Sequence, residues 1–316
     1  MKFSRQTTLR SQATVTGVGV HSGSAVSLTL GPAPIDAGFI FVRAGSGREV
    51  QAVAESVIAT EFATVLGDRN GPLVSTSEHV LAALRGMGVD NATIEIDGPE
   101  VPIMDGSSAP FVAAIDKAGI VTQSAARRFI QVVKPVQVAI GDSFGELRPH
   151  TGGFRAQVEI NFTNPVIGQQ RYMLDLSPER FRREIARART FGCVNDVAGL
   201  WEAGFARGAS FENTLVFDEE RLLNPEGLRY ADECARHKIL DVIGDLALAG
   251  LPLLGAYRSV RGGHKLNHAV LKALLADRTA WRVLESDAVR PRRGYAEVGS
   301  GMVGGMVAPA YGPDVS

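Results

Sequence analysis

The sequence predicts an α+β protein, and two observations carry this prediction. Short β-like runs come first and helical runs follow them, and this order repeats in the second half of the 316-residue chain. Strands followed by helices are typical of α+β proteins, whereas nucleotide-binding sheets alternate strand and helix. The length agrees, because 316 residues exceed one domain of ordinary size. We therefore expect two α+β domains.

In the first half, apolar runs bounded by turn residues predict strands, and runs of helical periodicity predict helices. The expected strands are 25–30, 38–44 and 91–97. The expected helices are "STSEHVLAALRGMG", with Ser75 as N-cap and Gly86 or Gly88 near its end, and "PFVAAIDKAG" at 110–119. These elements define a first domain over residues 1–125.

The pattern restarts near "QSAARR", which predicts a second domain over residues 126–286. Strands are expected at "IQVVKPVQVAI" and "RAQVEINF", and helices at "SPERFRREIAR" and over residues 232–246. From residue 287 the chain is rich in Gly and Pro, so residues 287–316 are expected to form a flexible tail.

Composition excludes several functional classes. The 33 basic and 34 acidic residues nearly cancel, which gives no electrostatic case for nucleic acid or an anionic membrane as partner. The first residues lack an apolar core of signal-peptide length, and the most apolar run, 246–257, is too short to span a bilayer. The two cysteines form neither a disulfide framework nor a CxxC site. We therefore expect a cytoplasmic protein.

The helix predicted over residues 232–246 carries a narrow polar stripe. A helix turns by about 100° per residue, which puts His237, Asp241 and Asp245 on one side and Ile, Leu and Val on the other. A solvated helix face is the commoner explanation of such a stripe. Solvated faces, however, usually mix Lys, Glu, Gln and Arg, whereas this stripe repeats a His and two short carboxylates. Those residue types at this spacing are typical of metal ligands.

A second pair of this kind, Glu78 and His79, lies in the first turn of an earlier predicted helix. Glu78 has a structural alternative, because Ser75 and Glu78 match a capping box in which the Glu bonds back to the cap. The functional alternative is a hydrolytic zinc centre, which needs three protein ligands and an open position for water. His79, His237 and Asp241 would then be ligands, and Glu78 would take a proton from the water.

His264, in "SVRGGHKLNH", falls in a glycine-rich turn, where an exposed loop histidine is the commoner explanation. The alternative is an acid that protonates the leaving amine of an amide and is kept charged by Asp245. His21, in "TGVGVHSG", is expected either as a loop histidine with satisfied hydrogen bonds or at the rim of a site.

Residues 189–217 are rich in large apolar side chains. Apolar residues at 197, 200 and 201 fit ordinary amphipathic helix packing, which is the commoner explanation. The alternative is a wall for a long apolar substrate group. Thr190 offers a hydroxyl that could bond a carbonyl oxygen.

Six motifs occur in a consistent order: "TGVGVHSG", "STSEHVLAALRGMGVDN", "PEVPIMDGSSAPF", "RTFG", "GLRYADECARHKILDVIGDL" and "GGHKLNH". Together they resemble the UDP-3-O-acyl-N-acetylglucosamine deacetylases, zinc amidases at the committed step of lipid A biosynthesis. The resemblance implies hydrolysis of the acetamide of an acylated UDP-N-acetylglucosamine, giving UDP-3-O-acyl-glucosamine and acetate. It also implies two similar domains, each a mainly antiparallel sheet packed on helices, with the helices at the centre in a β-α-α-β sandwich.

The resemblance implies a role for each residue that could carry chemistry. The implied metal ligands are His79, His237 and Asp241, with one zinc ion per chain, although iron(II) would accept the same ligands. The implied catalytic residues are Glu78 as base, His264 with its partner Asp245, and Thr190, which polarises the carbonyl. The implied substrate contacts are Lys238, Phe191 and Arg261, with the insert 191–217 forming the passage for the acyl chain. We expect a monomer.

Two positions depart from better-known members. Ala63 stands near the metal where cysteine is common, so no role of a thiol is expected there. Arg261 replaces a common lysine, which keeps the positive charge near the expected diphosphate but changes its donor geometry.

Two other functions are alternatives. A zinc amidase for another N-acyl sugar or peptide would ignore the acylated UDP-sugar and cleave a simpler amide. A non-catalytic protein that binds nucleotide sugars or lipids should have lost a catalytic residue, whereas every expected position holds a competent one.

Overall fold

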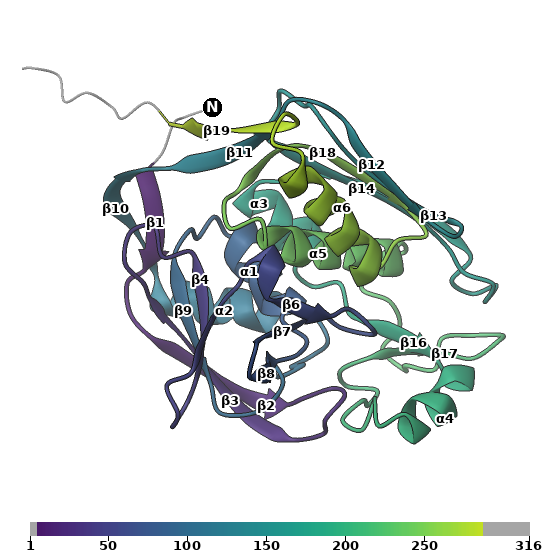
Figure 1. Ribbon diagram of the computed structural model, residues 1–316. Helices are drawn as coiled ribbons and strands as arrows, with labels where there is room; N and C mark the ends of the chain where they lie inside the picture. The colour runs from purple at the N-terminus through teal and green to yellow at the C-terminus, as the bar shows by residue number, and fades with distance from the viewer. Residues whose placement is uncertain (1–4, 287–316) are drawn as a thin grey trace, which may run out of the picture.

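The computed structural model describes residues 5–286 and confirms the α+β class (Figure 1). Two large sheets lie on opposite sides of the molecule, and helices occupy the space between them. The predicted tail, residues 287–316, lies outside the described residues. Within the described part of the chain, no helix combines the length and the apolar composition needed to cross a membrane.

The first large sheet comes from the first part of the chain and has the strand order β2-β3-β9-β4-β5. Its strands are β2 (Ala13–Val18), β3 (Ala25–Pro32), β4 (Phe39–Arg43), β5 (Glu49–Gln51) and β9 (Ala92–Ile96). All pairs are antiparallel except β4 with β9. Side chains alternate between buried and accessible positions along β3, so one face of the sheet enters the core. The three strands predicted here are confirmed.

Smaller elements complete this part of the chain. A three-stranded sheet contains β6 (Val57–Ala59), β7 (Val65–Asp68) and β8 (Gly71–Val74), and the short helix η1 (Ala54–Ser56) precedes it. A separate pair joins β1 (Arg5–Leu9) to β10 (Ile120–Ala126). Helix α1 (Glu78–Gly86) and helix α2 (Ala109–Ala118) lie on the inner side of the large sheet (Figure 1).

The second large sheet comes from the rest of the chain and is also mostly antiparallel. Its main strand order is β12-β13-β18-β11-β19, and β14 pairs with both β18 and β15. The strands are β11 (Arg128–Val132), β12 (Val136–Ile140), β13 (Ser143–Arg148), β14 (Phe154–Asn161), β15 (Gln169–Asp175), β18 (Leu253–Val260) and β19 (Trp281–Glu285). The single strand predicted at 130–140 is wrong: Pro135, which has no N–H to donate, separates β11 from β12.

Helix α5 (Glu233–Ala247) crosses the centre of the molecule, and α6 (His264–Ala276) packs against it; α5 contacts β14 and β15 of the second sheet, and α6 contacts β12 and β13 (Figure 1). A Cβ at Gly244 would collide with the Glu78 carbonyl, so this glycine allows α1 and α5 to approach closely. The polar stripe of α5 is therefore not a solvated face, because His237, Asp241 and Asp245 are all buried.

Helix α1 does not begin as the sequence suggested. Its N-cap is Ser77, which makes no side-chain capping bond, and Thr76 just before it has a φ of 55°. The predicted N-cap Ser75 forms a bridge with Glu100 instead. The capping-box interpretation is thus wrong, and Glu78 forms no capping box with Ser75. The predicted end of the helix is confirmed, since α1 ends at Gly86 and Gly88 has a φ of 82°.

Two further segments differ in detail from a regular helix. The helix predicted at 177–187 consists of α3 (Pro178–Arg180) followed by the π-helical turn η2 (Phe181–Ile185). The insert contains β16 (Phe191–Cys193) and β17 (Leu215–Phe217), which pair in parallel, and α4 (Val194–Glu202). Ordinary helix packing is the wrong explanation for α4, because none of its residues is buried.

Candidate metal centre and active site

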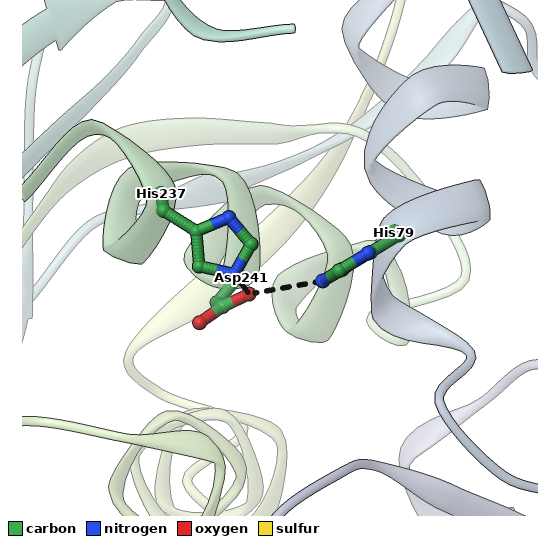
Figure 2. A group of neighbouring side chains, drawn as sticks. All are labelled: His79, His237 and Asp241. Carbon is green, nitrogen blue, oxygen red and sulfur yellow. Dashed lines mark ion pairs between the residues drawn. The ribbon is translucent and has the colours of Figure 1, made fainter. Parts of the chain in front are cut away.

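The three predicted metal ligands lie together although they come from two helices. His79 extends from α1, and His237 and Asp241 extend from successive turns of α5 (Figure 2). The Asp241 Oδ1 atom is 3.4 Å from His237 Nε2 and 3.9 Å from His79 Nε2. One potential ligand atom from each residue lies within 4.8 Å of the others, and all three side chains are buried. This group has the spacing and chemistry to hold a metal ion.

Hydrogen bonds leave the facing atoms of this group free for a cation. Asp241 Oδ1 is buried and has no hydrogen-bond partner among residues 5–286, whereas Oδ2 accepts a bond from Lys238 Nζ at 2.7 Å. His237 Nδ1 lies 3.0 Å from the carbonyl oxygen of Ala188. Because a carbonyl can only accept, this contact places the proton on Nδ1 and leaves the Nε2 lone pair toward Asp241.

The charge states of the group also suit a cation. Burial lowers the pKa of His79 to about 3, and it lowers the pKa of His237 as well, so both rings are neutral at pH 7. Burial works against an ionised Asp241, but the Lys238 ammonium opposes burial and helps to hold the pKa of this carboxyl well below its usual range. Two neutral imidazoles and one carboxylate therefore face each other.

Glu78 is adjacent to His79 in sequence but does not belong to the three-residue group. It is buried, and its Oε2 atom accepts a hydrogen bond from the Thr64 backbone N–H at 3.0 Å. Burial raises the pKa of Glu78 to about 7, against the opposing charge of His264. A carboxyl group with this pKa can both accept and return a proton near neutral pH.

His264 is the first residue of α6, so the expectation of an exposed loop histidine is wrong. Its Nδ1 donates to Asp245 Oδ2 at 2.8 Å, and its Nε2 lies 3.7 Å from Glu78 Oε1. Burial alone would lower the pKa of His264, but the Asp245 and Glu78 carboxylates outweigh burial and raise it to about 10. The imidazole is therefore charged at neutral pH, as predicted for a residue held by Asp245.

Sequence reasoning missed the two residues that hold Asp245. Thr64 donates its hydroxyl to Oδ1 at 2.6 Å, and Asn267 donates its amide to Oδ2 at 2.8 Å. Asn267 lies three residues after His264 on the same face of α6, which a helical interpretation of this segment would have found. Thr64 carries no comparable local signal, because 181 residues separate it from Asp245.

The three potential metal ligands, Glu78 and His264 line a cavity of about 350 Å³. The described residues around it also include Thr190, Phe191 and Lys238, which the sequence singled out, and apolar side chains of the insert such as Leu200. The Lys238 Nζ atom lies 5.4 Å from the Phe191 ring centroid. The insert therefore forms an apolar wall beside the polar group, and its role in receiving a long apolar substrate group stays a prediction.

Two other predicted residues have different outcomes. His21 lines the cavity, in agreement with a place at the rim of the site, and its ring contacts Phe205 edge to face at 5.3 Å between centroids. Phe62 packs on the same Phe205 at 4.8 Å and was missed by sequence reasoning. Arg261 is not among the residues around the cavity; it is partly exposed and its Nη1 lies 3.3 Å from Asp142.

This chemistry is that of a metal-dependent hydrolase, because a group able to hold a metal ion shares a cavity with a carboxyl that can exchange a proton with water. Residues 6–276 match the UDP-3-O-acyl N-acetylglycosamine deacetylase (LpxC) family. Proteins named UDP-3-O-acyl-N-acetylglucosamine deacetylase from Brucella ovis, Brucella canis and Brucella melitensis biotype 2 are each 48% identical to the chain over 284 residues. The aligned segment covers 89% of this chain and 99% of each relative. The chain belongs to this deacetylase family, which confirms the resemblance.

Proposed function

We propose that this protein hydrolyses the acetamide of UDP-3-O-acyl-N-acetylglucosamine and releases acetate and UDP-3-O-acyl-glucosamine, the committed step of lipid A biosynthesis. One observation carries the proposal. The buried ligand group, Glu78 and the charged His264 share one cavity with the apolar wall of the insert. An amide bond and a long acyl chain on one substrate would use both parts of that cavity.

We assign zinc to the site, held by His79, His237 and Asp241; iron(II) would accept the same ligands. A bound zinc ion supplies Lewis acidity, which makes water more acidic and polarises the acetamide carbonyl. The Lys238 ammonium, bonded to Asp241 Oδ2, keeps that carboxylate oriented and ionised. The bond from His237 Nδ1 to Ala188 fixes the orientation of this ring in the same way.

Glu78 acts as the general base in this proposal. It accepts a proton from the attacking water while the water oxygen forms a bond to the acetamide carbon. The Thr64 N–H holds one carboxyl oxygen and leaves the other directed at His264, so Glu78 can keep the proton until the amine needs it. The C–N bond then breaks, acetate leaves, and the amine nitrogen takes a proton.

Three hydrogen-bond donors that line the same cavity stabilise the negative charge that develops on the carbonyl oxygen. Protonated His264, the Thr190 hydroxyl and Lys238 are the donors that we assign to the oxyanion and to its collapse. His264 or Glu78 then supplies the proton to the leaving amine. Asp245 is a positioning residue, because it keeps His264 protonated and is itself held by Thr64 and Asn267.

The rest of the substrate would lie along the insert and the surface near it. Phe191 and the apolar residues of 191–217 would contact the acyl chain, and Lys238 would contact the sugar end. Arg261, on the surface, would contact the diphosphate after release from Asp142. The expected cytoplasmic location and monomeric state stay predictions.

We also propose that the chain forms two similar domains, residues 1–125 and 126–286, arranged as a β-α-α-β sandwich. The membership of the two large sheets supports this division, because one contains only strands before residue 126 (β2, β3, β4, β5 and β9) and the other only strands after it (β11 to β15, β18 and β19). The contact of α1 with α5 then becomes the contact between domains, and the ligand group spans it.

The test is acetate release from acylated UDP-N-acetylglucosamine, compared with the unacylated UDP-sugar and a simple N-acetyl peptide. The proposal expects turnover of the acylated substrate, and His264→Ala should lower turnover while the metal content stays unchanged. Cleavage of the simpler amides alone would favour an amidase of other specificity. Binding of the acylated substrate without acetate release would favour a non-catalytic binding protein.

A further inference from the structure

A second cavity, of about 220 Å³, lies away from the proposed active site and shares none of its lining residues. Its walls come from α1, β11, β14, α5 and β18 and from the segment that leads into α3, so both halves of the chain contribute. Most of the surface is apolar, including Phe129, Leu176, Ile243 and Leu246. An apolar cavity of about 150 Å³ can hold benzene, so this one has room for a short hydrocarbon group.

One charged side chain in the wall of this cavity, Arg85, has no hydrogen bond to the residues that the structure describes. Arg85 is only 8% exposed, and its Nε, Nη1 and Nη2 atoms have no hydrogen-bond partner in the described chain. Its nearest carboxylate atom, Asp90 Oδ1, is 3.8 Å away, which is too far for a hydrogen bond. The guanidinium also stacks over Phe39, with 4.9 Å from Cζ to the ring centroid. A buried guanidinium with five unused donor hydrogens calls for an acceptor.

The local charges leave one positive charge uncompensated. Asp90 already accepts a bond from Arg127 Nε at 2.8 Å, and Arg127 is the other charged residue around the cavity. Burial lowers the pKa of Arg85 only to about 10, so this residue is charged at neutral pH. Two guanidinium groups and one carboxylate sum to a single positive charge, which matches a monoanion better than a phosphate dianion.

We propose that this cavity binds a monocarboxylate with an apolar acyl tail. The carboxylate would accept paired hydrogen bonds from the guanidinium fork of Arg85, and the tail would lie against the apolar walls. The cavity touches the last turn of α1 at Arg85 and Gly86 and the second half of α5 at Ile243 and Leu246. An occupant would therefore brace the two helices that carry the ligand group, and binding should raise the unfolding temperature.

Octanoate is the probe for calorimetric titration, with octan-1-ol and acetate as controls that lack the charge or the tail. We expect octanoate to bind at least about tenfold more tightly than either control. Arg85→Met keeps the length of the side chain and removes the charge, and it should weaken octanoate binding by at least about tenfold. Arg258→Met, on the exposed side of β18, is the matched control and should leave the affinity unchanged.

The apolar wall of the active-site cavity could also take octanoate, so Val197→Trp is included to fill that passage. Binding that depends on Arg85 should persist in Val197→Trp. If Arg85→Met does not fold, Arg85→Lys keeps the charge without the fork and should still weaken binding at least about threefold. The proposal is overturned if octanoate does not bind, if octan-1-ol binds equally well, if the Arg85 variants bind octanoate like the unchanged protein, or if Val197→Trp removes the binding.

Discussion

The polar cluster between α1, α5 and α6 and the insert at 191–217 meet in one cavity but are built in opposite ways. In the cluster, Asp241 and Asp245 are each 2% exposed, and Lys238 and Thr64 hold them by hydrogen bonds. In the insert, Trp201 is 59% exposed and Phe211 is 49% exposed. The comparison indicates that buried contacts fix the proposed chemistry, while a loosely packed apolar surface receives the variable part of the substrate.

Burial and nearby charges also explain the unusual proton affinities in the cluster. Desolvation raises the pKa of Glu78, whereas nearby carboxylates raise the pKa of His264 in spite of desolvation. Changes in the cluster should therefore alter turnover, and changes in the insert should alter the apparent affinity for the acyl chain.

Glu78→Gln should have the largest effect, because the amide cannot accept the proton of water. We expect kcat to fall by about 10³- to 10⁴-fold. The metal content should not change, since Glu78 is outside the ligand group. The measurement is acetate release together with metal analysis of the same sample. A variant that keeps its turnover would remove Glu78 from the role of base.

Asp245→Asn should lower turnover by roughly 10²- to 10³-fold and change the pH profile. In the unchanged protein His264 keeps its proton up to about pH 10, because the Asp245 carboxylate favours the charged ring. Without that negative charge burial dominates, the pKa of His264 falls, and activity should disappear at a lower pH on the alkaline side. A pH profile of kcat is the measurement. An unchanged alkaline limb contradicts the coupling of these two residues.

Thr190→Val should reduce kcat by about 10²-fold, because it removes one proposed donor to the oxyanion and keeps the shape of the side chain. Thr190→Ser is the matched control, since it retains the hydroxyl and should recover most of the rate. Steady-state kinetics with one substrate at several concentrations provide the test. Equal rates for the Val and Ser variants would mean that the hydroxyl plays no part.

Leu200→Ser should have the smallest effect, and it should change KM rather than kcat. We expect KM for a long-chain substrate to rise about tenfold, the loss of roughly one buried apolar contact. The free energy of unfolding should change by less than about 0.5 kcal/mol, because α4 buries none of its residues. Glu202→Ser, on an exposed position of the same helix, should alter neither quantity. A fall in kcat with constant KM would contradict the assignment of the insert to the acyl chain.

The sequence was most informative where a single helix carries the signal. His237, Asp241 and Asp245 were predicted as one face because helical periodicity alone sets their spacing. His79 could be added to them because few histidines compete for the role. The repeated order of strand and helix runs predicted two α+β domains, and the family resemblance added that the two are similar and pack with their helices at the centre.

The break at Pro135 is a local effect, but other failures come from contact between segments distant in sequence. Glu78 was compatible with a capping box until the positive φ of Thr76 and the bond from Thr64 excluded it. Periodicity does not reveal that β18 pairs in parallel with β11 and β14, nor that Arg85 lines an apolar cavity. These features depend on the packing of the whole chain.

The most direct test of the central claim is metal analysis combined with acetate release for the unchanged protein and for Asp241→Ala. The account predicts about one zinc ion per chain and acetate release from acylated UDP-N-acetylglucosamine in the unchanged protein. In Asp241→Ala it predicts the loss of both the metal and the activity, with the fold retained. A variant that still releases acetate at the full rate, or a fully active protein without bound metal, would contradict it.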